Sequence, residues 1–211
     1  MNIRICGTGS ALPERIISND DLSQIMDTSD EWISSRTGIK TRHLATEETT
    51  TSLAAEAAKK ALADADMKPE EVELIIAATV TPDHLVPTLS CEVQREIGAV
   101  NAVAFDLGAA CSGFLFALST AQAYIASGRF KNALLIGAEV LSKIMDWNDR
   151  STCVLFGDGA GAAVVRADEE TLCHVVQGSD GAKGLVLACE NRPVNNGKST
   201  GLCKHERAGG L

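Results

Sequence analysis

Apolar and polar positions alternate in a regular way along most of this chain. The run Val72–Val80 (VELIIAATV) is almost wholly apolar and rich in β-branched residues, a pattern typical of a buried strand. Shorter apolar segments predict further strands at Ile3–Cys6, Ala102–Leu107 and Ala133–Gly137. Helical spacing and helix-ending residues predict helices at Leu53–Ala65, Thr88–Ile97 and Ser112–Ser127. Strands that alternate with helices indicate an α/β fold, in which helices cover a sheet.

The predicted helix Ser112–Ser127 is apolar around almost its whole circumference, with few polar residues beyond Ser119, Thr120 and Gln122. A helix of this kind is buried on all sides. We therefore expect it to lie between two layers, with protein both above and below it.

Two further predictions concern the last third of the chain. Gly157-Asp158-Gly159 separates the apolar segments Thr152–Phe156 and Ala160–Arg166, and an Asp-Gly pair in this position predicts a β-hairpin. The segment Asn191–Leu211 lacks periodicity and is rich in Asn, Gly and polar residues, so we expect a loop or a tail there.

Composition and charge exclude several classes of protein. The 211 residues are 45% hydrophobic and 22% charged, which is the mix of a globular chain and not of a disordered one. A net charge of −9 without a run of Lys or Arg argues against nucleic-acid binding, because phosphate contacts need a basic footprint. No stretch reaches the ~20 apolar residues that a membrane span needs. The N-terminus also lacks the pattern of a secretory signal.

Cysteine and histidine spacing argues against metal sites and disulfides. The seven cysteines are odd in number and lack C-x-x-C spacing, which favours reduced thiols and a cytoplasmic location. The four histidines show no metal-ligand spacing, so we expect no metal. Gly7-Thr8-Gly9 begins like a dinucleotide fingerprint, but Leu12 stands at the third glycine position and Pro13 follows.

Cys111 is the strongest candidate for chemistry. It follows the predicted strand Ala102–Leu107 and a Gly-Ala-Ala turn, and it lies at the N-terminus of the predicted helix. This order of strand, tight turn and helix resembles the nucleophile elbow of hydrolases. Unpaired helix N–H groups favour a thiolate there, and the backbone N–H groups of the turn can form an oxyanion hole. A buried structural cysteine is the alternative that these residues leave open.

A second candidate site lies near residue 30. Thr28 and Glu31 match the T-x-x-E capping box and Gly38 is a helix-ending glycine, which together predict a helix. Trp32 and Arg36 then share one face, where an indole and a guanidinium can clamp a flat ring such as adenine. The alternative is an ordinary surface helix with Trp32 half-buried in the core.

Arg150 lies in a polar loop, Met145–Ser151, before the predicted hairpin. An arginine in this position can bind a phosphate, or it can pair with the neighbouring Asp149. The glycine-rich segment Phe156–Gly161 lacks the Lys-Ser/Thr pair of a phosphate loop, so we interpret it as a tight turn near a site.

Five motifs of this chain resemble 3-oxoacyl-[acyl-carrier-protein] synthase III, in the order and at the spacing of that family. They are Gly9–Pro13, Thr28–Ile33, Arg36–Ile39, Phe105–Phe114 and Phe156–Ala162. The resemblance runs from the N-terminus to about residue 190. It implies an α/β, thiolase-like layered fold (αβαβα in the complete enzyme), in which the helix after Cys111 is the first of two buried central helices.

The resemblance also implies an activity, which opens type II fatty acid synthesis. An acyl group, usually acetyl from acetyl-CoA, is transferred to Cys111. Malonyl on acyl carrier protein then loses CO2, and its carbanion attacks the thioester to give a 3-oxoacyl product. The implied partners are acyl-CoA, malonyl-acyl carrier protein and a second copy in a homodimer. No cofactor beyond the CoA substrate, no nucleic acid and no membrane are implied.

Site residues follow from the same resemblance, position by position. Cys111 is the acylated nucleophile. The residues implied to bind CoA are Thr28, Trp32, Arg36, Thr37 and Arg150. Within this set the resemblance implies that Trp32 and Arg150 sandwich the adenine, while Arg36 contacts the phosphate end. Val86, before Pro87, is implied to reach across the dimer and line the acyl pocket of the partner, where a valine is expected to tolerate primers beyond acetyl.

One departure separates this chain from the family. The family's catalytic His and Asn belong to a second half, and none of the four histidines here matches that His. We expect residues 1–170 to form the N-terminal thiolase-like half and residues 171–211 to form a strand and loop connection toward the second half. This chain alone is then not expected to complete condensation. Two alternatives stay open: a related CoA-dependent acyltransferase or synthase of the thiolase superfamily, and an inactive fragment that binds CoA or dimerises.

Overall fold

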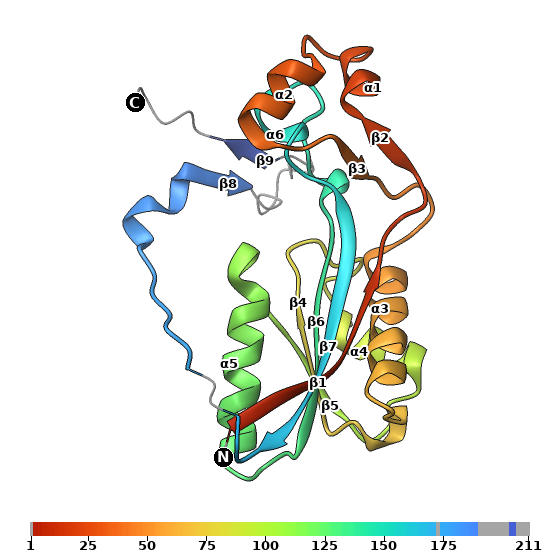
Figure 1. Ribbon diagram of the computed structural model, residues 1–211, viewed down its shortest axis with the longest axis vertical. Coiled ribbons are helices and arrows are strands. Elements are labelled where there is room, and N and C mark those ends of the chain that lie inside the picture. Colours follow the sequence, from red (N-terminus) through yellow and green to blue (C-terminus); the bar gives the residue numbers. More distant parts are fainter. Residues whose placement is uncertain (1, 172–173, 190–202, 206–211) are drawn as a thin grey trace. The chain divides into compact units, whose positions relative to one another are not determined.

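The computed structural model describes residues 2–171, 174–189 and 203–205 (Figure 1). These residues divide into two compact units. The first unit contains residues 2–13, 45–140, 158–171 and 174–175. The second unit contains residues 14–44, 141–157, 176–189 and 203–205. Each unit is therefore assembled from segments that are far apart in the sequence.

A mixed sheet of five strands forms the centre of the first unit, in the order β1-β7-β6-β4-β5. The strands are β1 (Asn2–Ala11), β4 (Leu74–Ala78), β5 (Val103–Leu107), β6 (Asn132–Val140) and β7 (Asp158–Asp168). β4 is parallel to β5 and β6, whereas β7 is antiparallel to β6 and β1. Every residue of β4 is buried, as its apolar run predicts. Because β4 and β5 are parallel, the segments that follow them leave the sheet at the same edge.

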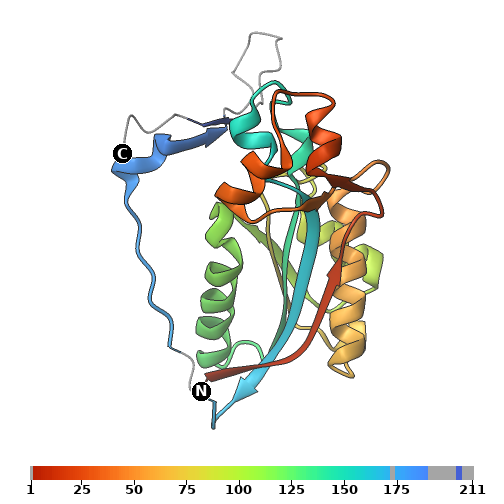
Figure 2. The ribbon, with the colours of Figure 1, turned by 45° about the horizontal axis from the view of Figure 1, so that its top comes forward.

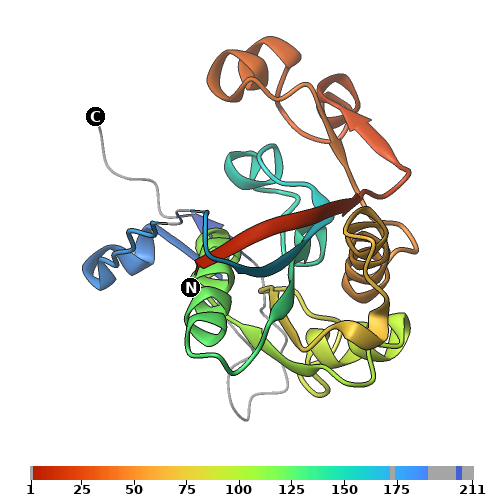
Figure 3. The same ribbon diagram turned by 60° about the horizontal axis from the view of Figure 1, so that its bottom comes forward.

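Helices cover both faces of this sheet, as expected for an α/β unit (Figures 1 and 3). α3 (Thr50–Asp64) and α4 (Leu89–Ile97) pack on one face, and α5 (Gly113–Ala126) packs on the other. Two short 3-10 helices, η1 (Pro69–Glu71) and η2 (Ala110–Ser112), precede β4 and α5. No helix among the described residues is both long and apolar enough to cross a membrane.

The helix α5 is covered on one side only in the described part of the chain. Its buried residues, Gly113, Ala117, Ala121 and Ile125, recur every four positions and face the sheet. Leu115 lies on the opposite side and is 59% exposed. The prediction that this helix is enclosed all round is therefore wrong for the described residues, because only the sheet supplies a packing surface.

β1 is longer than its apolar pattern predicts, because two glycines continue the strand beyond Cys6. A Cβ atom at Gly9 would lie 2.3 Å from the carbonyl oxygen of Ala57 and 2.4 Å from the backbone nitrogen of Ala61. Gly7 meets the backbone of α3 one turn further along in the same way. These glycines do not end a strand or hold a phosphate. They allow α3 to lie directly against β1.

The predicted hairpin at Gly157-Asp158-Gly159 is wrong. Asp158 begins β7, which pairs with β6 from Val140 onward, and the residues before it form the short helix α6 (Arg150–Cys153). Asp158 is buried and its carboxylate accepts a hydrogen bond from the backbone N–H of Ala45 at 2.7 Å. The Asp-Gly pair thus fastens the start of a strand, and tertiary contacts decide its conformation.

The segment after β4 is fastened to the sheet by a half-buried carboxylate, Glu139 of β6. Glu139 accepts hydrogen bonds from the backbone N–H of Val80 at 2.8 Å and from the hydroxyl of Thr79 at 3.3 Å. The hydroxyl of Thr81 donates a short hydrogen bond to the same carboxylate. Burial raises the pKa of Glu139, and these donors partly oppose the rise.

The second unit consists of short elements (Figure 2), and its apolar cluster is formed by residues of segments 14–44 and 141–157. They are β2 (Ile16–Ser18), α1 (Asn19–Ser23), α2 (Asp30–Thr37), β3 (Thr41–His43), η3 (Leu141–Lys143), α6, η4 (Gly181–Val186), β8 (Leu187–Cys189) and β9 (Cys203–His205). β2 pairs with β3, and β8 pairs with β9. The strand β9 differs from the loop or tail predicted for Asn191–Leu211, whose other residues lie outside the described part.

The close approach of α3 to β1 makes Gly9 intolerant of a side chain. We expect Gly9→Ala to lower the free energy of unfolding by about 1–3 kcal/mol, the cost of overpacking a well-packed core. Gly161 of β7 is the matched control, because a Cβ atom there meets nothing within 4 Å. Urea denaturation of both variants measures the difference, and equal stabilities would contradict the packing account.

The burial of Glu139 gives stability a pH dependence of known sign. Its pKa is higher in the folded state than in the unfolded chain, so its contribution is complete below the unfolded pKa and is lost as the pH rises through the folded pKa. We expect the unfolding free energy of the wild type, minus that of Glu139→Gln, to fall from about pH 4 to neutral pH. Denaturation curves at several pH values test this, and a rising difference would refute it.

Candidate active site

Cys111 lies at the junction of a strand and a helix. β5 ends at Leu107, the 3-10 turn η2 contains Cys111, and α5 begins at Gly113. The predicted order of strand, turn and helix is thus confirmed, with the helix starting one residue later than expected. The thiol is exposed, so the alternative of a buried structural cysteine is wrong.

The backbone directly before Cys111 is in an uncommon conformation. Ala110 has a φ angle of +44°, in the left-handed region that residues with a Cβ atom rarely adopt. Such a conformation costs on the order of 1–3 kcal/mol and persists only where the surrounding structure imposes it. Strain of this kind next to an exposed thiol is typical of a functional turn.

Small residues surround the thiol. A Cβ atom at Gly108 would meet nothing within 4 Å, which leaves open space on the turn. Ser112, the N-cap of α5, makes no side-chain capping hydrogen bond, so the first N–H groups of the helix are not capped by that side chain. A Cβ atom at Gly113 would lie 2.7 Å from the Cβ of Ala78, so this glycine lets α5 start directly on β4. The turn can therefore present a nucleophile to a substrate. The N–H groups of Ser112 and Gly113 donate to the carbonyl oxygens of Ala109 and Ala110 within the turn.

Other cysteines in the described residues lack this setting. Cys153 is buried in α6, where burial raises its pKa and where its Sγ lies 3.4 Å from the sulfur of Met26. Such a thiol is poorly reactive. Cys6 is half-buried in β1, and Cys91 is exposed on α4 away from any strand-to-helix turn.

The helix near residue 30 forms, but one residue later than its capping pattern predicts. α2 begins at Asp30, and Ser29 is its N-cap, whose hydroxyl accepts a hydrogen bond from the N–H of Trp32 at 3.1 Å. The prediction of a capping box at Thr28 and Glu31 is therefore wrong, because the neighbouring serine caps the helix instead. Gly38 ends α2 in the left-handed conformation, with a φ angle of +73°, as expected.

Two guanidinium groups lie against the ring of Trp32. The Cζ atom of Arg36 is 4.7 Å from the ring centroid, and that of Arg150 is 4.9 Å from it. Arg36 also donates a hydrogen bond to the carbonyl oxygen of Trp32 at 3.1 Å. The shared face of Trp32 and Arg36 is thus confirmed, while Trp32 is also half-buried against the core of its unit. We call these three residues the clamp.

Asp27, which is far from Arg150 in the sequence, holds Arg150 in the clamp. Arg150 donates a short hydrogen bond to the carbonyl oxygen of Asp27, and its guanidinium forms an ion pair with the carboxylate of Asp27 at 3.3 Å. Arg150 is the first residue of α6 and does not lie in a loop, and Asp149 caps that helix by accepting from the N–H of Ser151 at 2.9 Å.

The two threonines beside the clamp differ in what their hydroxyls do. The hydroxyl of Thr37 donates to the carbonyl of Ile33 at 2.8 Å and accepts from the N–H of Ile39 at 3.0 Å, so it stabilises the end of α2. The hydroxyl oxygen of Thr28 is buried and has no hydrogen-bond partner within the described chain. Thr28 therefore has the capacity to bond a ligand without giving up an existing contact.

Val86 lies in the segment between β4 and α4. It is 86% exposed, and its neighbour Leu85 is exposed to the same degree. The residues around them are fixed: Asp83 accepts from the backbone N–H of Thr51 at the start of α3, and His84 pairs with the buried Glu92 at 2.8 Å. Two apolar side chains are thus presented to the outside on a firmly held segment.

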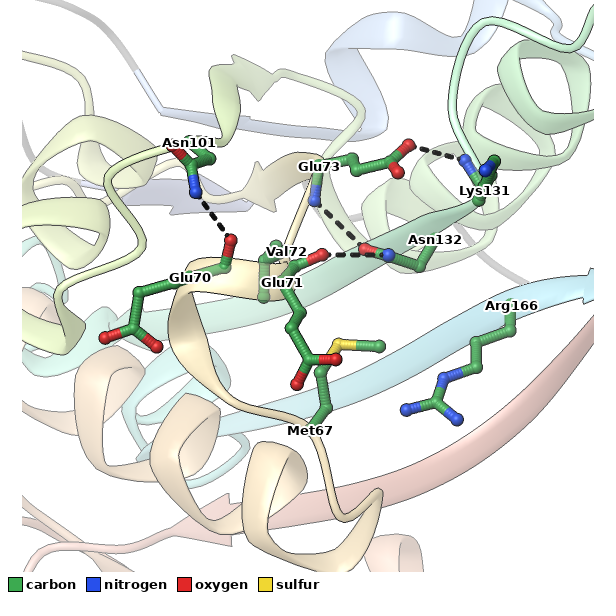
Figure 4. A pocket seen from close by; sticks show the side chains of 9 residues that line it. All are labelled: Met67, Glu70, Glu71, Val72, Glu73, Asn101, Lys131, Asn132 and Arg166. Carbon is green, nitrogen blue, oxygen red and sulfur yellow. Dashed lines mark hydrogen bonds between the residues drawn. The ribbon is translucent and has the colours of Figure 1, made fainter.

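A cavity of about 540 Å³ lies in the first unit, at the start of β4 and β6 (Figure 4). Its walls bond to one another: Asn101 donates to the carbonyl of Glu70 at 2.8 Å, and the N–H of Glu73 donates to the side chain of Asn132 at 3.0 Å. These bonds stabilise the end of the sheet and expose no nucleophile. No group of His, Cys, Asp and Glu side chains in the described residues has the arrangement of a metal site.

Comparison with known proteins places this chain in a family. Residues 105–184 match the family described as 3-oxoacyl-[acyl-carrier-protein (ACP)] synthase III. The beta-ketoacyl-[acyl-carrier-protein] synthase III of Clostridium acetobutylicum is 54% identical over 196 residues, which cover 92% of this chain and 60% of that protein. The chain thus spans about 60% of the length of the curated relatives that it matches.

Solved structures of similar proteins have the same fold. The crystal structure of 3-oxoacyl-[acyl-carrier-protein] synthase III from Aquifex aeolicus VF5 matches with a TM-score of 0.90 and 47% identity, over 97% of this chain and 64% of that chain. A second crystal structure of a 3-oxoacyl-(acyl-carrier-protein) synthase III matches with a TM-score of 0.87 and 30% identity, over 99% of this chain and 68% of that chain. The thiolase-like fold expected from the sequence is therefore confirmed, and the chain belongs to the 3-oxoacyl-[acyl-carrier-protein] synthase III family.

Proposed function

We propose that this protein is a decarboxylative condensing enzyme that initiates type II fatty acid synthesis. It takes an acyl group from acyl-CoA, joins it to malonyl-acyl carrier protein, and releases CoA and CO2. The observation that carries this proposal is the exposed Cys111 on the strained turn between β5 and α5, in a chain of this family.

The first half-reaction is acyl transfer to sulfur. The Sγ atom of Cys111 attacks the thioester carbonyl, the bond from carbon to the CoA sulfur breaks, and the proton lost by Cys111 ends on CoA. Backbone N–H groups of the turn stabilise the oxyanion that forms on the way. In the second half-reaction malonyl loses CO2, and the electron pair that is released forms the new carbon–carbon bond. Cys111 leaves as a thiolate and takes up a proton.

The clamp binds the nucleotide end of CoA. An adenine between Trp32 and Arg150 needs about 3.5 Å on each side of its ring, and Arg150 now lies 4.9 Å from the centroid of the indole. Arg150 therefore moves outward by about 2 Å when the ring inserts, while Arg36 contacts a phosphate and Thr28 supplies a hydroxyl. The hydroxyl of Thr37 can donate to CoA only if it releases the carbonyl of Ile33, but its oxygen can accept one more hydrogen bond.

The remaining parts of the proposal concern assembly and location. The protein acts as a cytoplasmic homodimer, in which Val86 lines the acyl pocket of the second copy. Its high exposure beside Leu85 supports this role, because two unpaired apolar side chains gain most from burial in a partner. Residues 1–170 form the N-terminal thiolase-like half, and residues 171–211 lead toward a second half. This division stays a prediction.

Acylation of Cys111 is the direct test of the chemistry. We expect incubation with acetyl-CoA to add one acetyl group, located on Cys111 by mass spectrometry of peptides. Cys111→Ala abolishes the adduct because the nucleophile is gone, whereas Cys91→Ser, which changes another exposed cysteine, leaves it intact. An adduct that survives Cys111→Ala rejects the assignment, and no adduct in the wild type favours an inactive fragment. On residues 1–211 alone we expect the adduct without a 3-oxoacyl product after malonyl-acyl carrier protein is added.

Trp32→Ala tests the clamp separately from the chemistry. Stacking of a base on an aromatic ring contributes about 1–3 kcal/mol, so we expect the Kd for CoA to rise by about tenfold or more. Trp32→Phe keeps a ring and is expected to lose less. Calorimetric titration with CoA measures both variants, and the position of the acetyl adduct on Cys111 should not change. Unaltered affinity in Trp32→Ala would exclude the clamp as the nucleotide site.

A further inference from the structure

The second unit contains a buried arginine that no carboxylate balances among the described residues. Arg42 of β3 is only 6% exposed. One end of its guanidinium donates to the carbonyl of Ile17 at 3.2 Å. The other end donates to the side-chain oxygen of Asn19 at 2.7 Å and to the carbonyl of Val154 at 3.3 Å. Burying an unpaired charge is costly, so its presence calls for a role other than stability.

Asn19 extends this contact to both ends of α2. It is 1% exposed, and its amide nitrogen donates to the carboxylate of Asp30 at 2.8 Å, at the first residue of the helix. The same nitrogen donates to the carbonyl of Ile39 at 2.7 Å, just past the final glycine. The bond from Asn19 to Asp30 is the largest of three that lower the pKa of that carboxylate to about 2; the others come from Lys40 and Ser34. α2, which carries Trp32 and Arg36, is thus fixed along its whole length by one side chain.

On its other side, the guanidinium of Arg42 bonds to α6, the helix that carries Arg150. Val154 is the C-cap of α6, and Arg150 is its first residue. Asn19 and Arg42 therefore form a continuous link of hydrogen bonds from α2 to α6. The link joins the two elements whose separation determines how far Trp32 lies from Arg150.

We propose that Arg42, acting with Asn19, is a positioning residue that sets the spacing of the clamp for an adenine nucleotide. This inference rests on the proposed function, because it takes the clamp as the nucleotide site of acyl-CoA. Arg42 does not touch the ligand. It keeps α6 in place while Arg150 swings outward, so that the side chain moves and the backbone that carries it does not.

The proposal makes a prediction about which acyl donors are affected. Acetyl-CoA uses the clamp, whereas acetyl-pantetheine carries the same thioester without the nucleotide. We expect Arg42→Met to lower kcat/KM for acylation of Cys111 by acetyl-CoA at least tenfold, mainly through KM. The rate with acetyl-pantetheine stays within about twofold, because the elements around Cys111 belong to the first unit. Arg42→Lys keeps the charge but lacks the forked donors, so we expect an intermediate loss.

Matched controls separate positioning from general damage. Arg129→Met removes an exposed arginine of the first unit and should change neither donor. Asn19→Ser cuts the same link at its other end and should reproduce the selective loss, which keeps the test available if Arg42→Met does not fold. A wild type that shows no preference for acetyl-CoA refutes the clamp itself. A wild-type preference that persists in the Arg42 and Asn19 variants, or an equal loss with both donors, overturns the positioning role.

Discussion

The contact between the start of α5 and the end of β4 is the constraint on which the reactive site depends. A Cβ atom at Gly113 would lie 2.7 Å from the Cβ of Ala78, so this position has no room for a side chain. Because α5 is fixed there, the short turn from β5 has only a few residues in which to reach it. Within this turn Ala110 adopts the left-handed region and Cys111 is exposed. Packing two residues away thus determines the position of the thiol.

The two units of this chain obtain their rigidity in different ways. In the first unit, apolar clusters on both faces of the sheet hold the helices in place. The second unit has short helices and a small apolar cluster, and it relies on buried polar side chains that span several elements. Hydrogen bonds fix distance and direction more narrowly than apolar contacts do, which suits the adenine clamp that we propose.

Long periodic segments could be predicted from the sequence, and local signals that depend on neighbours could not. The buried strand β4 and the helices α3 and α4 follow from their own apolar patterns. The existence of α5 also follows from its pattern, but its burial does not, because burial depends on which other segments cover the helix. The hairpin predicted from the Asp-Gly pair at Asp158 does not form, because a hydrogen bond from Ala45 holds Asp158 at the start of a strand. The strand β1 passes through Gly7 and Gly9 because α3 requires glycine there, which the local pattern does not reveal.

In the candidate site, too, features set by a local pattern could be predicted, and features set by distant neighbours could not. Cys111 could be found from its strand, turn and helix, and the pairing of Trp32 with Arg36 follows from helical spacing. The contact of Arg150 with Trp32 joins distant segments, and only the resemblance to a family indicated it. Arg42 and Glu139 were not predicted at all, because their partners lie far along the chain and no local motif marks them.

The left-handed conformation of Ala110 has a consequence for the order in which parts of the protein lose their structure under heat or mild denaturant. A backbone held in an unfavourable state is the first to relax when its supports loosen, because relaxation there releases free energy instead of consuming it. The thiol next to it then loses its orientation while the sheet and its helices persist. The proposed reactivity of Cys111 is in this sense more easily lost than the fold of the first unit.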